Sequence, residues 1–298
     1  MGRVANAGSG VRHALEVGRY MPARRTNKGA PHSPAATGGD VAPADEADLP
    51  DWFENHYRSA AGEVVSFLAE DGITLEGRDV ADIGSGDGLI DLGVFHLGHP
   101  RQLVGFDVEP TDAHRLDEWA RRFRVADTLP EGLGFSGATP TSLPVADESY
   151  DVVFSWSAFE HVQEPVHVAL EMARILRPGG VLMLQVWPFY FSERGGHRWL
   201  WAPEGFSHLV GDPSSIESLA HSTPVTDQPV TAERLLQGTL NRITLDELQR
   251  CLMVSGFVVT KLQVLTETVH IPPKLARYPL SLLGISGVKL LAVRHPMF

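Results

Sequence analysis

The sequence predicts an α/β protein built on a doubly wound, mostly parallel sheet. First, short apolar runs typical of buried strands alternate with stretches of helical periodicity between residues 79 and 187. Second, the first apolar run breaks into three alternate glycines and then opens a helical pattern. Third, 298 residues with 43% hydrophobic content supply enough chain for a full α/β core.

Residues 1–49 precede the predicted domain, which we place at residues 50–298. They are rich in Gly, Ala, Pro and Arg, and their charge changes from basic at Arg24 and Arg25 to acidic at Asp45. This composition is typical of a disordered tail. An organelle transit peptide, or true initiation at Met21 or later, stays open as an alternative.

The elements follow one another in an order that fits the fold class. A helix is predicted at 51–72, where Trp52, Phe53 and Tyr57 either pack in the core or cover a ligand. Strands are predicted at 79–83, 102–108, 133–138, 150–156, 181–187, 257–266 and 287–294, and further helices at 89–97, 111–124, 164–176 and 244–254. Right-handed crossovers then place a ligand at the carboxyl ends of the parallel strands.

The stretch DVADIGSGDGLID at 79–91 predicts a strand, a tight turn and a helix N-terminus. Gly84, Gly86 and Gly88 permit positive φ and let a ligand approach the backbone, while the first N–H groups of the helix favour an anionic group. A dinucleotide fingerprint needs its third glycine at position 89, which is Leu89. The spacing therefore argues against a pyrophosphate.

Two carboxylates indicate a different ligand. Asp82 stands at the strand tip, where it would repel a pyrophosphate and attract an ammonium group. Asp107 ends the next strand, where a carboxylate can accept hydrogen bonds from both hydroxyls of a ribose. A nucleoside joined to an amino acid describes S-adenosylmethionine.

With these residues in place, the sequence resembles the class I S-adenosylmethionine-dependent methyltransferases, especially those acting on small molecules. DIGSGDG is similar to their first motif, GFDVEP to their ribose-binding motif, and SLPVADESYDVVFSWSAFEHV with ALEMARILRPGGVLML to a later strand-helix-strand stretch. The resemblance covers residues 50–187 and resumes weakly at 243–259. It implies a seven-stranded, Rossmann-like sheet with an antiparallel last strand and an insertion after the fifth strand.

The resemblance also implies where the cofactor binds. The expected cofactor-binding residues are Asp82, Gly84, Ser85, Gly86, Gly88, Asp107, Thr139 and Ser155. Thr139 departs from the family, which commonly has an Asp there to contact the adenine amino group, although Thr can still accept one hydrogen bond. Pro140 has no N–H to offer the adenine ring.

We expect the insertion at residues 188–242 to act as a lid or substrate pocket. It carries many aromatic and histidine side chains amid Gly and Pro, among them His197, Trp199 and Trp201. A surface insertion whose aromatics only pack beneath it is the alternative. His197 and His161 are the candidate general bases, and a structural histidine is the alternative for His161. No recognisable metal-ligand set surrounds the histidines of the insertion.

Composition limits the partners. The formal charge of −12, with no basic stripe, disfavours a nucleic-acid substrate. The single cysteine, Cys251, cannot form an intramolecular disulfide, and we find neither a secretory signal nor an apolar run that could span a bilayer. We therefore expect a cytoplasmic protein without stable membrane insertion; its oligomeric state stays open.

These observations predict a methyltransferase that moves a methyl group from S-adenosylmethionine to an oxygen, nitrogen or carbon of a small molecule. A sugar, a lipid precursor and a secondary metabolite are all open as acceptors. A non-catalytic scaffold that keeps the cofactor pocket is one alternative. An NAD-dependent dehydrogenase is another, opposed by Leu89 and by the absence of an obvious Tyr-x-x-x-Lys pair.

Overall fold

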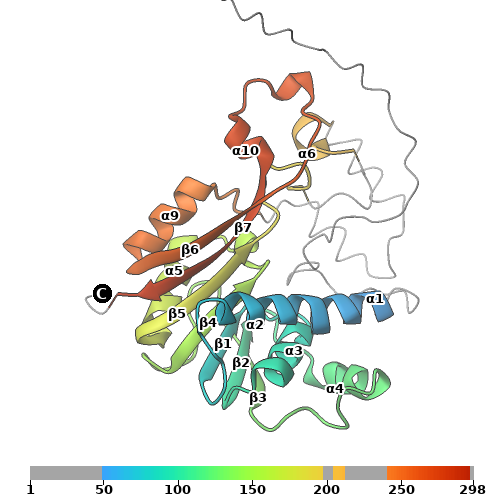
Figure 1. The fold of residues 1–298 in the computed structure, drawn as a ribbon, viewed down its shortest axis with the longest axis vertical. Coiled ribbons are helices and arrows are strands. Elements are labelled where there is room, and N and C mark those ends of the chain that lie inside the picture. The colour runs from blue at the N-terminus through green and yellow to red at the C-terminus, as the bar shows by residue number, and fades with distance from the viewer. Residues whose placement is uncertain (1–48, 197–203, 212–239, 296–298) are drawn as a thin grey trace, which may run out of the picture. The chain divides into compact units, whose positions relative to one another are not determined.

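The computed structural model describes residues 49–196, 204–211 and 240–295, and these contain a seven-stranded sheet (Figure 1). Its order is β3-β2-β1-β4-β5-β7-β6. The strands are β1 Asp79–Ile83, β2 Gln102–Asp107, β3 Leu133–Gly137, β4 Tyr150–Trp156, β5 Leu176–Val186, β6 Phe257–Thr266 and β7 Ile285–Arg294. Strands β1 to β5 pair in parallel, and β7 runs antiparallel to both of its neighbours. The predicted fold class is confirmed, including the antiparallel last strand.

Helices cover both faces of this sheet (Figure 1). The helices of the described residues are α1 Leu49–Phe53, η1 Glu54–Ala60, α2 Ala61–Ala69, α3 Leu89–Gly98, α4 Ala113–Arg122, η2 Phe159–His161, α5 Pro165–Ile175, α6 Ser207–Val210, α9 Leu245–Val254, η3 Pro273–Leu275 and α10 Leu280–Gly284. On one face, α2 and α3 bury Val64 and Val94 against Phe154 of β4. On the other, α5 and α9 bury Met172 and Leu248 against the sheet. Burial on both faces explains why the central strands β1, β4 and β5 read as nearly continuous apolar runs.

The predicted N-terminal helix is present and is continuous through α1, η1 and α2, which we call the N-terminal helix. Its middle segment, η1, is π-helical. The helix lies across the sheet on the side of α3, because the Tyr57 hydroxyl is 2.9 Å from His96 Nδ1 of α3 and Lys289 Nζ of β7 is 3.1 Å from Glu63 Oε2. A Cβ at Gly93 of α3 would collide with the Tyr57 backbone and with Ala61, so a glycine there permits this close approach.

The structure differs from the predicted elements in two places. Strand β5 begins at Leu176, because Leu176 already pairs with Tyr150 and the register then shifts over the Pro-Gly-Gly at 178–180. Two short helices, η3 and α10, lie between β6 and β7, where the Pro-containing sequence has no clear periodicity. They bury Leu275 and Leu283 in a small core with Phe206, from the insertion after β5.

Across the ranges that the structure describes, no helix has the length and apolar character needed to cross a bilayer. The five parallel strands end at the same edge of the sheet, and the glycine turn after β1 lies at that edge.

Candidate cofactor-binding site

The glycine turn adopts a backbone that only glycine tolerates well. Gly84, Gly86 and Gly88 have φ values of 92°, 52° and 79°. A Cβ at Gly88 would lie 2.8 Å from Phe135 Cζ and 2.9 Å from Leu116 Cδ2. The turn therefore packs against its neighbours through bare backbone and leads directly into the N-terminus of α3.

Asp107, at the end of β2, is held against this turn. Its Oδ2 accepts a hydrogen bond from the Gly86 N–H at 3.0 Å, and its Oδ1 accepts one from the Glu109 N–H at 2.9 Å. Each carboxylate oxygen has a second lone pair. The structure thus holds the Asp107 carboxylate against the backbone of the glycine turn at Gly86.

Ser85 and Thr111 lock the turn from the other side. Thr111 Oγ1 donates to the Gly86 carbonyl at 2.9 Å, so the Ser85 hydroxyl, 3.1 Å away, donates to Thr111. Sequence reasoning missed Thr111, because nothing in the spacing of GFDVEP marks a loop residue as a partner of a turn so distant in the chain.

Asp82 and Asp91 are two fully buried carboxyl groups beside the turn. Asp82 is the fourth residue of β1, and Asp91 lies in the first turn of α3. When both are ionised, Oδ1 of Asp82 and both oxygens of Asp91 have no hydrogen-bond donor among the residues that the structure describes, and the two carboxyl groups hydrogen-bond to each other once one of them is protonated. Burial, and then the charge of Asp107, raises the pKa of Asp82 well above its ordinary value; burial, and then the charge of Asp82, does the same for Asp91. A buried pair of carboxyl groups that raise each other's pKa fits a cationic ligand group such as an ammonium, which would stabilise their charge.

Trp52 is the aromatic residue of the N-terminal helix that reaches the turn. Its Nε1–H donates to Asp87 Oδ2 at 2.7 Å, while Asp87 Oδ1 accepts from the Leu89 N–H at 3.0 Å. Phe53 instead stacks on Phe123 in the core, with ring centroids 4.1 Å apart. Of the three aromatic residues expected either to pack or to cover, Trp52 is therefore the one that is hydrogen-bonded to the glycine turn.

Two of the expected cofactor-binding residues are engaged elsewhere. Ser155 is buried, and its hydroxyl donates to the Ile83 carbonyl at 2.7 Å, so it ties β4 to the last residue of β1. Thr139 is exposed in a small turn, where its hydroxyl donates to the Ser142 carbonyl at 3.4 Å. Ser155 thus stabilises the end of β1 that leads into the glycine turn. The Thr139 hydroxyl oxygen keeps a lone pair that faces solvent.

The two candidate bases have different outcomes. His161 lies at the end of η2, where burial lowers the pKa of its imidazole to about 4. It is neutral at neutral pH and only weakly basic. His197 lies outside the described residues, as do Trp199 and Trp201.

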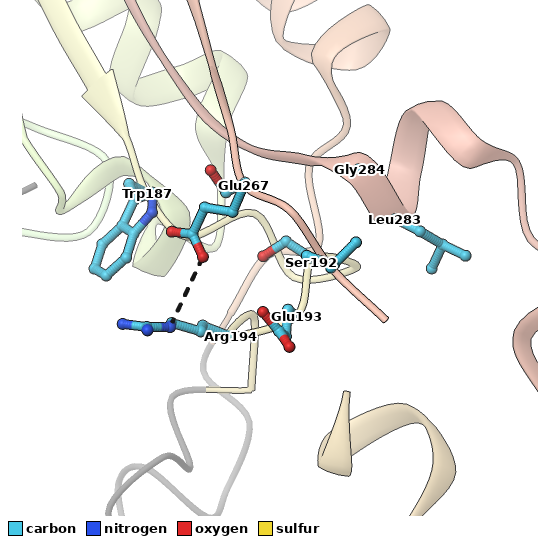
Figure 2. A pocket seen from close by; sticks show the side chains of 9 residues that line it. Trp187, Ser192, Glu193, Arg194, Glu267, Leu283 and Gly284 are labelled. Atoms are coloured by element: carbon cyan, nitrogen blue, oxygen red, sulfur yellow. Dashed lines mark ion pairs between the residues drawn. The ribbon is translucent and has the colours of Figure 1, made fainter. Parts of the chain in front are cut away.

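A narrow groove opens at the carboxyl end of β5 (Figure 2). It lies between the segment after β5 and the connection of β6 to β7, and Figure 2 shows Trp187 and Arg194 facing Glu267 across it. Arg194 Nε is 4.0 Å from Glu267 Oε2. Ser286 Oγ, also in the lining, is buried without a hydrogen-bond partner in the described part of the chain. In that same part, no group of three or more His, Cys, Asp or Glu is placed to hold a metal ion.

Comparisons with known proteins agree with this geometry. Residues 81–184 match the family model described as a methyltransferase domain. An uncharacterised methyltransferase of Mycobacteroides abscessus is 29% identical over 163 residues, which cover 53% of this chain and 58% of the relative. Another, from Mycolicibacterium paratuberculosis, is 32% identical over 189 residues, which cover 63% of this chain and 62% of the relative. The chain thus spans between half and two thirds of these relatives.

Solved structures share the fold at low sequence identity. The [4+2]-cyclase SpnF has a TM-score of 0.51 at 18% identity, covering 80% of this chain and 82% of its own. The geranyl diphosphate C-methyltransferase of Streptomyces coelicolor A3(2) has a TM-score of 0.50 at 13% identity, covering 85% and 90%. With the strand order and the glycine turn, the match of residues 81–184 to a methyltransferase domain and the similarity to these relatives support a class I S-adenosylmethionine-dependent methyltransferase.

Proposed function

We propose that this protein transfers a methyl group from S-adenosylmethionine to a small-molecule acceptor. One observation carries the proposal: the glycine turn holds the Asp107 carboxylate on Gly86 and has two buried carboxyl groups, Asp82 and Asp91, beside it. A ribose and an ammonium are the ligand groups that fit these two features. S-adenosylmethionine contains both.

In this proposal the chain's own residues bind and orient the cofactor. The backbone of residues 84–88 faces the cofactor's amino-acid end, Asp82 attracts its ammonium, and Asp107 accepts from its ribose hydroxyls. Thr139 lies on the adenine side, and Ser155 holds the turn in place from β4. When bound, S-adenosylmethionine supplies a methyl group on a cationic sulfur, so the protein mainly contributes alignment and exclusion of water.

Acceptor recognition is assigned in this proposal to the groove after β5 and to the insertion at 188–242. Trp187 directly precedes that insertion and Arg194 lies near its start, and the groove lies at the carboxyl edge where the methyl group is expected. His197, Trp199 and Trp201 stay predicted lid residues. His161 stays a candidate base, although an imidazole with a pKa of about 4 is a weak proton acceptor.

Mass spectrometry on cell extracts tests the proposal. Small-molecule extract is incubated with the protein and S-adenosylmethionine, and products that gain one methyl group are sought together with S-adenosylhomocysteine. Their absence, with cofactor binding intact, would favour a scaffold or another reaction. The [4+2]-cyclase SpnF shares this fold, and one fold can carry different reactions, so the experiment must distinguish methyl transfer from another reaction.

A second experiment tests the lid. Trp199→Ala and His197→Ala should change the acceptor KM and leave cofactor affinity nearly intact. A drop in melting temperature without any change in KM would mean that the aromatics only pack the insertion.

The cytoplasmic location and the exclusion of nucleic acid stay predictions from composition.

A further inference from the structure

His56 is a buried histidine of the N-terminal helix with one ring nitrogen to spare. It lies in η1, and its side chain is 2% exposed. Its ring stacks on Trp52, with centroids 4.0 Å apart, and Trp52 in turn donates to Asp87 of the glycine turn. Two consecutive contacts therefore connect the imidazole to the cofactor-binding turn.

The tautomer of His56 follows from its one hydrogen bond. Nδ1 lies 2.8 Å from the Trp52 carbonyl oxygen, and a carbonyl can only accept, so Nδ1 carries the proton. Nε2 of the neutral ring then presents a lone pair. Nε2 is buried and has no hydrogen-bond partner within the described ranges. A lone pair held in this way is available to take a proton from a ligand.

The polar residues below the N-terminal helix show where this lone pair lies. Lys289, which binds Glu63, is in register with Gln185 of β5, and Gln185 is in register with Trp156 of β4. Trp52, four residues before His56, reaches the turn after β1, and Glu63, seven residues after it, reaches β7. His56 therefore lies on the stretch of the helix between these two contacts, and β4 and β5 are the strands between β1 and β7. Consistent with this, Trp156 packs in one cluster with Ala60, the residue one turn after His56.

Trp156 and Gln185 also have unused hydrogen-bonding groups. Both side chains are at most 1% exposed. The Trp156 indole N–H and both polar atoms of the Gln185 amide lack partners among the described residues. Buried polar groups in folded proteins are nearly always satisfied. Trp156 and Gln185, paired at the carboxyl ends of β4 and β5, share this property with His56 of the N-terminal helix, and the three together indicate a polar ligand group between the sheet and that helix.

We propose that His56 is the general base of methyl transfer and that Gln185 and Trp156 bind the polar group of the acceptor beside it. This inference rests on the proposed function and narrows its substrate class. The acceptor is an uncharged molecule with a hydroxyl nucleophile next to a carbonyl or second hydroxyl, because a Gln amide both donates and accepts while the indole only donates.

The step balances without a further reactant. The acceptor oxygen forms a bond to the methyl carbon, and the bond from that carbon to sulfur breaks with its electron pair staying on sulfur. The hydroxyl proton passes to His56 Nε2, and the resulting imidazolium later releases it to water. Besides His56, the titratable groups of the N-terminal helix are Asp51, Glu54, Tyr57, Arg58 and Glu63, and those near it on the neighbouring elements include Asp82, Asp87, Asp91, His96, Lys261 and Lys289.

The test uses the full-length protein, methyl-tritiated S-adenosylmethionine and small-molecule cell extract as the source of acceptor. We compare wild type with His56→Gln, His56→Ala and His96→Gln. The last is a matched control, because His96 is a partly buried histidine that contacts the same helix through Tyr57. Cofactor affinity, melting temperature and tritium transfer are measured from pH 6 to pH 9.

We expect His56→Gln to lower tritium transfer by about 100-fold at neutral pH with cofactor affinity within about twofold of wild type. The loss should shrink toward pH 9, and added imidazole should restore part of the activity of His56→Ala. His96→Gln should transfer tritium at nearly the wild-type rate. Gln185→Leu should raise the acceptor KM.

Transfer at the wild-type rate by His56→Gln would overturn the inference and leave the proposed function standing. Equal losses of cofactor affinity and transfer, without imidazole rescue, would also overturn it by showing a structural role. If the wild type binds the cofactor but transfers no tritium, the proposed function fails, and this inference fails with it.

Discussion

At the scale of single residues, Asp107 offers the most direct test of the cofactor site. Its carboxylate accepts the Gly86 N–H, and a carboxylate is the group we expect to accept from the ribose hydroxyls. Asp107→Ala should weaken S-adenosylmethionine binding by about 1.5–3 kcal/mol, since a charged hydrogen-bond partner is lost. Asp107→Asn, which keeps one carbonyl oxygen, should lose less. Calorimetric titration measures both, and wild-type affinity in Asp107→Ala would contradict the assignment.

Asp91 makes a separate prediction about pH. Burial in the folded protein raises the pKa of this carboxyl above its ordinary value of about 3.9. In the pH window between the ordinary and the raised pKa, the folded state holds a proton that the unfolded chain releases. Stability therefore falls as pH rises through that window. Asp91→Asn should raise the melting temperature at neutral pH, and the gain should vanish near pH 4.

The control for Asp91→Asn is Asp127→Asn, at an exposed carboxylate. This control should leave the melting temperature unchanged throughout the range. A melting temperature of Asp91→Asn below that of wild type at neutral pH would show that the Asp91 charge is stabilised by groups that this account omits.

At the scale of elements, the glycine turn predicts a sharp contrast between two glycines. Gly88 has a φ of 79° and no room for a Cβ, whereas a Cβ at Gly134 of β3 would meet nothing within 4 Å. Gly88→Ala should cost at least about 1–3 kcal/mol of stability, because the backbone is strained and Phe135 and Leu116 must move. Gly134→Ala should be nearly neutral. Thermal unfolding of the two variants checks this, and equal melting temperatures would contradict the packing described for the turn.

The elements that local pattern predicts are those that the structure reproduces. Strands β4 and β6 have the predicted bounds. A short apolar run bounded by turn residues indicates a strand, and this pattern is visible in the local sequence. Helix α9 begins at the predicted cap, where the Thr244 side chain accepts from the Glu247 N–H at 3.3 Å. The glycine turn and Asp107 were predictable for the same reason, because their spacing is read directly from the chain.

Features that depend on tertiary contacts could not be predicted in this way. The π-helical segment η1 has no pattern of its own, and the burial of His56 depends on packing against the sheet. Asp91 reads as an ordinary residue of an amphipathic helix, yet it is fully buried. The hydroxyl of Ser155 is used on Ile83, a contact between strands that the motif alone does not reveal.

At the scale of the whole described domain, the insertion after β5 and the connection between β6 and β7 share one small core. Phe206 is fully buried there against Leu275 and Leu283. Phe206→Ala should therefore expose both segments to hydrogen exchange while changing S-adenosylmethionine affinity by less than about twofold, because the glycine turn lies outside this core. If Phe206→Ala lowered both the protection of these amides from hydrogen exchange and the affinity for S-adenosylmethionine, the small core and the glycine turn would be coupled.

The central claim is that the glycine turn binds S-adenosylmethionine, and a competitive calorimetric titration of the wild-type protein with S-adenosylmethionine and NADH tests it most directly. The account predicts saturable binding of S-adenosylmethionine with one site per chain and no heat from NADH, because Leu89 replaces the third glycine of a dinucleotide turn and Asp82 repels a pyrophosphate. Saturable binding of NADH with no binding of S-adenosylmethionine would contradict it.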